Sequence, residues 1–376
     1  MSPHPCRHCG SPLEHTVIDL GHQPPSNAYL RPEQLALPEI TYPLRVFVCT
    51  GCWLVQLPAH AAAEDLFTAD YAYFSATSSS WCAHAERYVA AAVKRLGLGP
   101  QSQVVELASN DGYLLQYVQQ RGIPCLGIEP THATAEAARA KGITTIERFF
   151  GLALAAELEP ADLVVANNVL AHVPDINDFV AGIARLLKPT GRASIECPHL
   201  LRLLAGNQFD TISHEHYSYL SLHVVQRIAV AAGLAVVEAV FAAEAAAGLE
   251  TLAAYAGFQQ RAEAAKHGLL EFLLQSKRDG RRVLGYGAAA KGNTLLNYAG
   301  IRADLLPAVA DRAPSKQGKH LPGSHIPVIR PEQLAAQAPD ALLVLPWNQI
   351  DELRQQLPGY ELVTAIPELR HWGDHN

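Results

Sequence analysis

Two histidines and a glutamate occupy consecutive positions in the stretch FDTISHEHYSYL, as His214, Glu215 and His216. A metal ion would need both imidazoles to face the same way, which happens on a strand, where alternate residues share a face. Proton transfer would need one imidazole as the base, with Glu215 orienting it or raising its basicity. The residue types disfavour the metal and leave proton transfer and a solvated loop almost equally open.

Cysteines occur in two close pairs, Cys6 with Cys9 and Cys49 with Cys52. Each pair places two thiolates on one tight turn, and two such turns complete a tetrahedral site for zinc. A redox pair or four unrelated thiols are the alternatives. However, the segment around the cysteines is too poor in apolar residues to fold without a cross-link such as a bound metal ion. We predict a structural zinc ion, since four thiolates leave no open position for catalysis.

The stretch VVELASNDGYLL has the pattern of a strand, a sharp turn and a helix. Its single glycine fails the GxGxxG pattern of a dinucleotide site, and its acidic and amide side chains suit a cationic, hydroxyl-bearing ligand. An acid at the end of the next strand could hold two ribose hydroxyls, as S-adenosylmethionine requires. The alternative is an α/β domain with polar residues at this edge. The predicted cofactor residues are Glu106, Ala108, Asn110, Asp111, Gly112, Glu129, Asn167 and Asn168.

His172 follows the third predicted strand of this block, in ANNVLAHVPD. The carboxyl edge of a parallel sheet is where ligands collect. A lone histidine there can also be a packing residue, but its place above the cofactor favours contact with a substrate.

A second glycine turn, in GYGAAAKGNTLL, opens a helix that begins with Lys291 and Asn293, and Lys316 lies on a later loop. A helix start and lysines favour an anion such as a diphosphate. The equally weighted alternative is a turn that only joins a strand to a helix.

Strands alternating with helices indicate an α/β protein whose central domain is a doubly wound, Rossmann-like sheet. A second, smaller alternating block begins at VLGYG. We expect three domains: a zinc-binding domain over residues 1–65, a doubly wound α/β domain over 66–255 and a second, Rossmann-like α/β domain over 256–376. Periodicity leaves the alanine-rich stretch 242–256 unassigned.

The composition argues for small-molecule partners. The chain has 376 residues, 49% of them hydrophobic, and a net charge of −7 without a dense basic run, so we expect neither a nucleic acid nor a membrane partner. The beginning of the chain lacks a signal-peptide pattern, and seven cysteines do not suggest a disulfide framework. We therefore expect a cytoplasmic protein, either a monomer or a homodimer.

Many stretches together resemble one family, the S-adenosylmethionine-dependent sugar C-methyltransferases. They include CRHCG, GHQPPSNAYL, CTGCW, YAYFSATSSSW, VVELASNDGYLL, NNVLAHVPDINDFVAGIARLLKPTG, QFDTISHEHYSYLS, GYGAAAKGNTLLNYAGI and DRAPSKQGKHLPGSHIP. The resemblance covers essentially the whole chain. It implies an N-terminal zinc-binding domain, a central methyltransferase domain and a C-terminal Rossmann-like substrate-binding domain. It also implies the reaction, which is methylation of C-3 beside the C-4 ketone of a nucleotide-linked deoxysugar, such as a dTDP-linked keto-sugar.

The resemblance also implies roles for residues. His216 matches the base, Glu215 its partner, His172 a substrate or oxyanion contact, and Tyr73 or Tyr71 a substrate-lining tyrosine. The predicted substrate-binding residues are Ser213, His214, Lys291, Asn293 and Lys316.

The chain departs from the family pattern in two places. Ser213 stands where the family has a tyrosine, and AAAGLETLAAY stands where it reads close to THGGSLR. A methyltransferase for a non-sugar substrate and a non-catalytic binding protein therefore stay as alternatives. A nicotinamide-dependent oxidoreductase is disfavoured because the dinucleotide pattern is incomplete.

Overall fold

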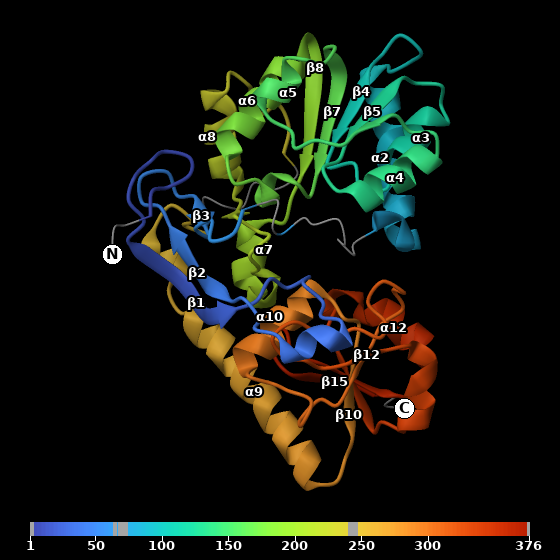
Figure 1. The fold of residues 1–376 in the computed structure, drawn as a ribbon. Coiled ribbons are helices and arrows are strands. Elements are labelled where there is room, and N and C mark those ends of the chain that lie inside the picture. Colours follow the sequence, from blue (N-terminus) through green and yellow to red (C-terminus); the bar gives the residue numbers. More distant parts are fainter. Residues whose placement is uncertain (1–3, 63–65, 67–73, 240–246, 374–376) are drawn as a thin grey trace.

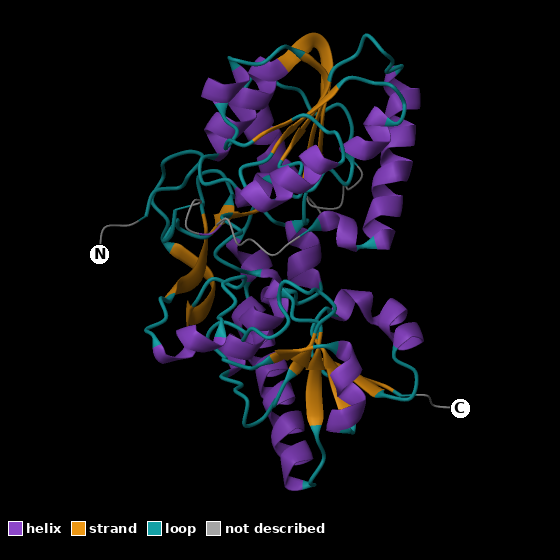
Figure 2. Cartoon of the chain, turned by 45° about the vertical axis from the view of Figure 1, so that its right-hand side comes forward, coloured by secondary structure: helices purple, strands orange, loops and turns teal. Residues whose placement is uncertain are grey.

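The computed structural model describes residues 4–62, 66, 74–239 and 247–373. Figure 1 shows a central sheet with its helices at the top, a C-terminal unit at the bottom, and an N-terminal sheet at the left between them. Strands and helices of all three units are distinguished by colour in Figure 2. No described helix is long and apolar enough to cross a membrane.

The central sheet is parallel throughout, with strand order β6-β5-β4-β7-β8. Its middle strand VVEL is buried at every position, as expected for a strand covered on both faces. This arrangement confirms the predicted doubly wound α/β fold. The strands are β4 (Val104–Leu107), β5 (Cys125–Ile128), β6 (Thr145–Ile146), β7 (Ala161–Asn167) and β8 (Leu187–Glu196).

Helices lie on both sides of this sheet, with α2, α3 and α4 on one side and α5, α6 and α8 on the other (Figure 1). The pattern DGYLLQYVQQRG predicts a helix over residues 111–122, but α3 begins only at Leu115, because the turn after β4, with positive φ at Ala108, Asn110 and Gly112, continues through residue 112. The helices are α2 (Ser79–Leu96), α3 (Leu115–Gln119), α4 (His132–Ala140), α5 (Leu152–Ala155), α6 (Ile176–Leu186), α7 (Leu200–Ala205) and α8 (Leu222–Ala231).

The N-terminal sheet is antiparallel and includes a strand from far along the chain. Its order is β1-β2-β3-β9, and β9 begins two residues after His216, the last residue of the His214 to His216 cluster. Leu57 N also donates to Tyr217 O over 3.0 Å, which extends the ladder toward the cluster. The strands are β1 (His15–Gln23), β2 (Tyr42–Val48), β3 (Val55–Gln56) and β9 (Ser218–Tyr219).

The C-terminal unit has a six-stranded sheet of order β12-β11-β10-β13-β14-β15, parallel except for β15. It is the second α/β unit that the sequence predicts. Of the alanine-rich stretch, residues 242–246 lie outside the described residues, and a 3-10 turn spans Leu252–Tyr255. The elements are α9 (Phe258–Arg278), β10 (Val283–Tyr286), α10 (Ala290–Ala299), β11 (Val309–Ala310), β12 (Val328–Ile329), α11 (Leu334–Gln337), β13 (Ala341–Val344), α12 (Ile350–Gln356), β14 (Glu361–Thr364) and β15 (Arg370–Trp372).

One apolar core joins the N-terminal sheet to the C-terminal unit. It contains Val46 of β2, Leu204 of α7, Phe258 of α9 and Leu296 of α10, all buried. Because these side chains pack in one cluster, the N-terminal sheet is attached to both neighbouring units. The exact domain limits stay predictions.

Thr294 of α10 lies at this junction. Its hydroxyl donates to Ile212 O over 2.8 Å and lies 3.3 Å from Ser26 Oγ, and its side chain is fully buried. One hydroxyl thus connects the C-terminal unit, an N-terminal loop and the segment that leads to His216.

We expect Thr294→Val to lower the free energy of unfolding by about 1–3 kcal/mol, because Ile212 O loses its donor inside the protein. Thermal and urea unfolding measure this effect, and Thr190→Val on the exposed part of β8 is the matched control. Equal stability of the two variants would contradict this account of the junction.

Candidate active site

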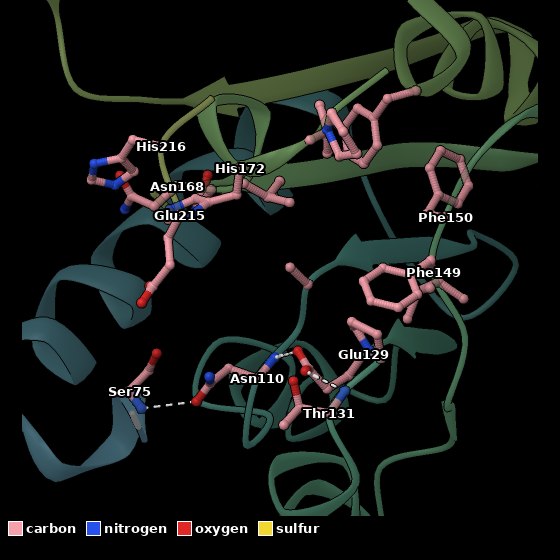
Figure 3. A pocket seen from close by; sticks show the side chains of 18 of the residues that line it. Ser75, Asn110, Glu129, Thr131, Phe149, Phe150, Asn168, His172, Glu215 and His216 are labelled. Carbon is pink, nitrogen blue, oxygen red and sulfur yellow. Dashed lines mark hydrogen bonds between the residues drawn. The ribbon is translucent and has the colours of Figure 1, made fainter. Parts of the chain in front are cut away.

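A cavity of about 560 Å³ lies at the carboxyl edge of the central sheet. Residues after β4, β5 and β7 form one part of its wall, and Ser213, Glu215 and His216 form another. Ala290, the first residue of α10, and Asn27 complete it from the other two units. The cavity therefore brings the predicted cofactor turn and the predicted base into one space (Figure 3).

The turn after β4 has a tightly constrained backbone. Ala108, Asn110 and Gly112 have φ values of 54°, 50° and 73°. The positive φ of Gly112 favours glycine there, and an added Cβ would lie 2.3 Å from Ile143 Cδ1 and would have to displace that side chain. This backbone presents Ala108 and Asn110 to the cavity.

Glu129 at the end of β5 is held by two backbone groups. Asn110 N donates to its Oε2 and Thr131 N donates to its Oε1, each over 2.9 Å (Figure 3). The carboxylate is thus fixed at the cavity wall, and each oxygen can accept another hydrogen bond. That geometry suits a pair of ribose hydroxyls.

Behind this wall lies a group of buried acids. Burial, followed by the charges of Glu129 and Asp111, raises the pKa of Glu106, and among the described residues its Oε2 has no hydrogen-bond partner. Asn167 Oδ1 also has no hydrogen-bond partner among the described residues, and Asn167 lines the cavity. An acceptor without a donor beside a buried acid fits the ammonium group of S-adenosylmethionine.

Five of the predicted cofactor residues line the cavity and three do not. Glu106 and Gly112 lie behind the wall, and Asp111 accepts from Ala76 N and pairs with Lys141 Nζ at 3.6 Å. Asp111 therefore anchors the segment before α2. The five that line the cavity are Ala108, Asn110, Glu129, Asn167 and Asn168.

His216 has a fixed ring orientation. Its Nδ1 lies 2.7 Å from Thr211 O, which can only accept, so Nδ1 carries the proton and Nε2 is the basic nitrogen of the neutral ring. Burial lowers the pKa of His216, the bond to Thr211 O opposes this effect, and the charge of Lys291 adds to the lowering. The imidazole is consequently neutral at pH 7.

Glu215 does not pair with His216, contrary to the prediction from the sequence. Its Oε1 accepts from Asn27 Nδ2 over 2.7 Å, and Glu215 as a whole residue is 4% exposed. Figure 3 shows the two side chains diverging, with Glu215 extending toward Ser75. The partner of His216 is instead the backbone of Thr211.

His172 lies against His216, with ring centroids 4.5 Å apart and planes tilted by 57°. Burial, and next the charge of His216, lower the pKa of His172 to about 3, although a bond to the Glu215 backbone opposes the shift. Two imidazoles this close do not carry charge together. His172 therefore stays neutral.

Of the other predicted substrate residues near the cluster, Ser213 lines the cavity and His214 does not. The His214 Nε2 lies 3.2 Å from Tyr42 O, and burial lowers the pKa of its imidazole to about 4. His214 thus packs against the N-terminal sheet. Tyr73 and Tyr71 lie outside the described residues.

The predicted anion cradle is placed beside the cavity, not in its wall. Lys291 Nζ lies 2.8 Å from Asn348 Oδ1 and 4.8 Å from the Trp347 ring centroid. Asn293 is 1% exposed and donates to Ser26 O over 2.6 Å. Lys316 Nζ donates to a backbone carbonyl over 2.8 Å and lies 3.7 Å from Asp311 Oδ2. The side chains of Asn293 and Lys316 thus form hydrogen bonds to the backbone of other segments of the protein.

Several wall residues were not predicted from the sequence. Phe149 and Phe150 follow β6, so the carboxyl-edge rule that identified Glu129 could have found them. Trp81 stacks on Tyr113 with centroids 6.1 Å apart, and nothing in its local sequence indicates this contact. Asn27 was not predicted either, because its partner Glu215 lies 188 positions away and no local pattern indicates the contact.

The four cysteines form one cluster at the edge of the N-terminal sheet. Cys6 Sγ lies 3.5 Å from Cys52 Sγ, Cys9 Sγ lies 3.5 Å from Cys49 Sγ, and all four sulfurs lie within 4.8 Å of one another. Zinc–sulfur bonds of about 2.3 Å place tetrahedral thiolates roughly 3.8 Å apart, so the cluster fits zinc. Gln56 Nε2 donates to Cys6 Sγ over 3.0 Å, which supports the ligand from behind.

Family models match three parts of the chain. "Putative zinc binding domain" matches residues 6–67, "Methyltransferase domain" residues 81–239 and "C-methyltransferase C-terminal domain" residues 220–367. These matches agree with the cysteine cluster, the central parallel sheet and the C-terminal unit described above.

The chain is also similar to individual proteins. The C-methyltransferase NovU of Streptomyces niveus is 34% identical, over 97% of this chain and 96% of that protein. Among solved structures, the YcgJ protein from Bacillus subtilis has a TM-score of 0.33 and 18% identity, covering 40% of this chain and 67% of that chain. A SAM dependent methyltransferase from Archaeoglobus fulgidus has a TM-score of 0.32 and 15% identity, covering 39% of this chain and 68% of that chain.

We expect Cys49→Ser to remove the zinc and to lower the melting temperature, because Cys49 is fully buried and the four thiolates share one ion. Metal content by atomic emission spectrometry should fall from about one ion per chain to a small fraction. Cys125→Ser, outside the cluster, is the control and should keep its metal. A Cys49→Ser protein with full metal content would refute the assignment of Cys49 as a ligand.

Proposed function

Because this chain belongs to the family of S-adenosylmethionine-dependent C-methyltransferases, we propose that it methylates C-3 of a nucleotide-linked 4-keto-deoxysugar with His216 as the base. The observation that carries the proposal is the shared cavity, which has the cofactor turn in one wall and His216 in another. A carbon beside a ketone is weakly acidic, so its methylation needs a base close to the methyl donor.

His216 suits this task because its Nε2 carries the lone pair and its ring is neutral near pH 7. Nε2 would take the C-3 proton, and the electron pair left behind would form an enolate with the ketone oxygen. S-adenosylmethionine, when bound, would supply an electrophilic methyl group from its sulfonium sulfur and would be left as S-adenosylhomocysteine. The C-3 carbon gains that methyl group, and the proton held by His216 leaves to solvent.

Ser213 and Glu215 are the proposed polar contacts of the sugar. The serine hydroxyl can donate toward the developing oxyanion, and the Glu215 carboxylate can accept from a sugar hydroxyl. Both line the cavity, and the backbone bond from His216 N to Ser213 O, 3.1 Å long, keeps Ser213 and the base in one turn. His172 would keep the 215–216 backbone in place through its bond to Glu215.

We propose Lys291 as the main contact for the diphosphate. It follows Ala290, which lines the cavity, and a ligand that extends past Ala290 would reach its ammonium group. Burial lowers the pKa of Lys291, but the carboxylate of Asp210 opposes that shift. Asn293 and Lys316 would then shape the surrounding backbone through their bonds to Ser26 O and Ala288 O.

A non-sugar acceptor is the second candidate, favoured by the serine at position 213 in the cavity wall. Purified protein, labelled S-adenosylmethionine and a panel of dTDP-linked 4-keto sugars distinguish the two. We expect transfer to at least one sugar and a new C-methyl signal by NMR. Cofactor binding without transfer to any sugar, together with transfer to another carbonyl compound, would establish the second candidate.

We expect His216→Ala to reduce turnover by roughly 10²- to 10⁴-fold, with little change in cofactor affinity, because only the base is lost. In the unaltered protein, kcat/KM should stay level from high pH down to the ordinary histidine pKa of about 6.5. It should decline only at a lower pH, because the pKa of His216 is lowered in the folded state and the base works only when neutral.

The measurements are initial rates from pH 5 to 9 and calorimetric titration with S-adenosylhomocysteine. His371→Ala, at the distant β15 edge, is the control. Full activity of His216→Ala, or an acid limb centred above pH 7, would exclude His216 as the base.

A further inference from the structure

The N-terminal unit sends one side chain into the cavity. Of the described residues 4–62, Asn27 alone contributes to the cavity wall. It belongs to the GHQPPSNAYL stretch, which begins in the last residues of β1 and continues from residue 24 into the loop between β1 and β2, apart from the cysteine turns. A loop residue that lies outside both the cysteine turns and the strands therefore reaches the cavity.

Asn27 contacts one of the buried acids of the site. Its Nδ2 donates to Glu215 Oε1 over 2.7 Å, and both partners come from segments far apart in the sequence. A hydrogen bond to a charged carboxylate is stronger than one between neutral groups. An amide is also the donor that fixes a carboxylate without adding a positive charge beside the neighbouring histidines.

The loop that carries Asn27 is held on both sides. Ser26 O accepts from Asn293 Nδ2 over 2.6 Å, and Ser26 Oγ lies 3.3 Å from Thr294 Oγ1. On the other side, the Tyr29 hydroxyl donates to Ala288 O at the turn after β10. Because these contacts are buried, the C-terminal unit fixes the position of Asn27.

We propose that Asn27 is a positioning residue that holds the Glu215 carboxylate toward the acceptor substrate. This inference rests on the proposed function, in which Glu215 accepts a hydrogen bond from a substrate hydroxyl. Without the amide, Glu215 would have other rotamers available, and the acceptor would lose its alignment with His216. A misplacement of about 1 Å can reduce a rate by about 100-fold.

Two variants in the full-length enzyme test the role. Asn27→Ala should lower kcat by about 10- to 100-fold, with zinc content and affinity for S-adenosylhomocysteine unchanged. Asn27→Asp places two carboxyl groups at the distance of the present hydrogen bond, where they share one proton and the pKa of the pair is raised. The shared proton replaces the amide donor, so this variant should be more active than Asn27→Ala at low pH.

The pH dependence separates positioning from bulk stability. As the pH rises and the Asn27→Asp variant loses the shared proton, repulsion should displace Glu215 and kcat should fall, while kcat of the unaltered protein does not. Among the described residues, titratable side chains near Glu215 include Tyr29, His172 and His216. Burial raises the pKa of Tyr29 and lowers those of both histidines, so none of them produces a decline between pH 7 and 9.

A readout independent of turnover is the melting temperature. The melting temperature of Asn27→Asp should fall further below that of the unaltered protein as the pH rises. The reason is that the pKa of the carboxyl pair is raised in the folded state, and the stability that the shared proton gives is lost above that pKa. Asn297→Asp is the control, since Asn297 donates to Pro322 O and lies outside the cavity. It should show no such pH dependence.

The outcomes separate this inference from the proposed function. If His216→Ala is inactive and Asn27→Ala keeps the unaltered kcat, only the inference fails. If Asn27→Asp follows the pH profile of the unaltered protein in both kcat and melting temperature, the inference also fails. If His216→Ala is fully active, the proposed function itself fails.

Discussion

The pairing of β9 with β3 is the contact on which the geometry of the active site depends. Val55 pairs with Tyr219 and Gln56 with Ser218, only two residues beyond His216. The strand β3 begins three residues after Cys52, and the Gln56 amide donates to Cys6 Sγ. The thiolate cluster therefore fixes β3, β3 fixes β9, and β9 determines the position of His216.

The enclosure of the two histidines determines their chemistry. Burial disfavours the imidazolium form at both His172 and His216, and their separation of 4.5 Å adds repulsion. The bond to Thr211 O partly offsets the loss at His216, because that carbonyl stabilises the charged ring. His216 is thus the one of the pair that can accept a proton, although it is a weaker base than a histidine in water.

What the sequence predicts well is local. The parallel strands follow from alternation of strand and helix patterns, and Glu129 follows from the carboxyl-edge rule because its geometry is set within one strand-turn-helix unit. The cysteine pairs are equally local. The failures involve contacts across units. Glu215 pairs with Asn27, and Asn293 with Ser26, because the three units fold against one another, which residue types at close spacing do not encode.

In the proposed reaction, the serine at position 213 can affect acceptor specificity without disturbing His216, the proposed base. Its backbone carbonyl accepts from His216 N, and any residue at this position can make that bond. A tyrosine, which the family pattern has here, would project a phenol ring from the same wall. With serine, that volume is left to the acceptor or to water, while the bond from His216 to Thr211 O is unaffected. Position 213 can therefore vary with the acceptor as long as the backbone turn that holds His216 is kept.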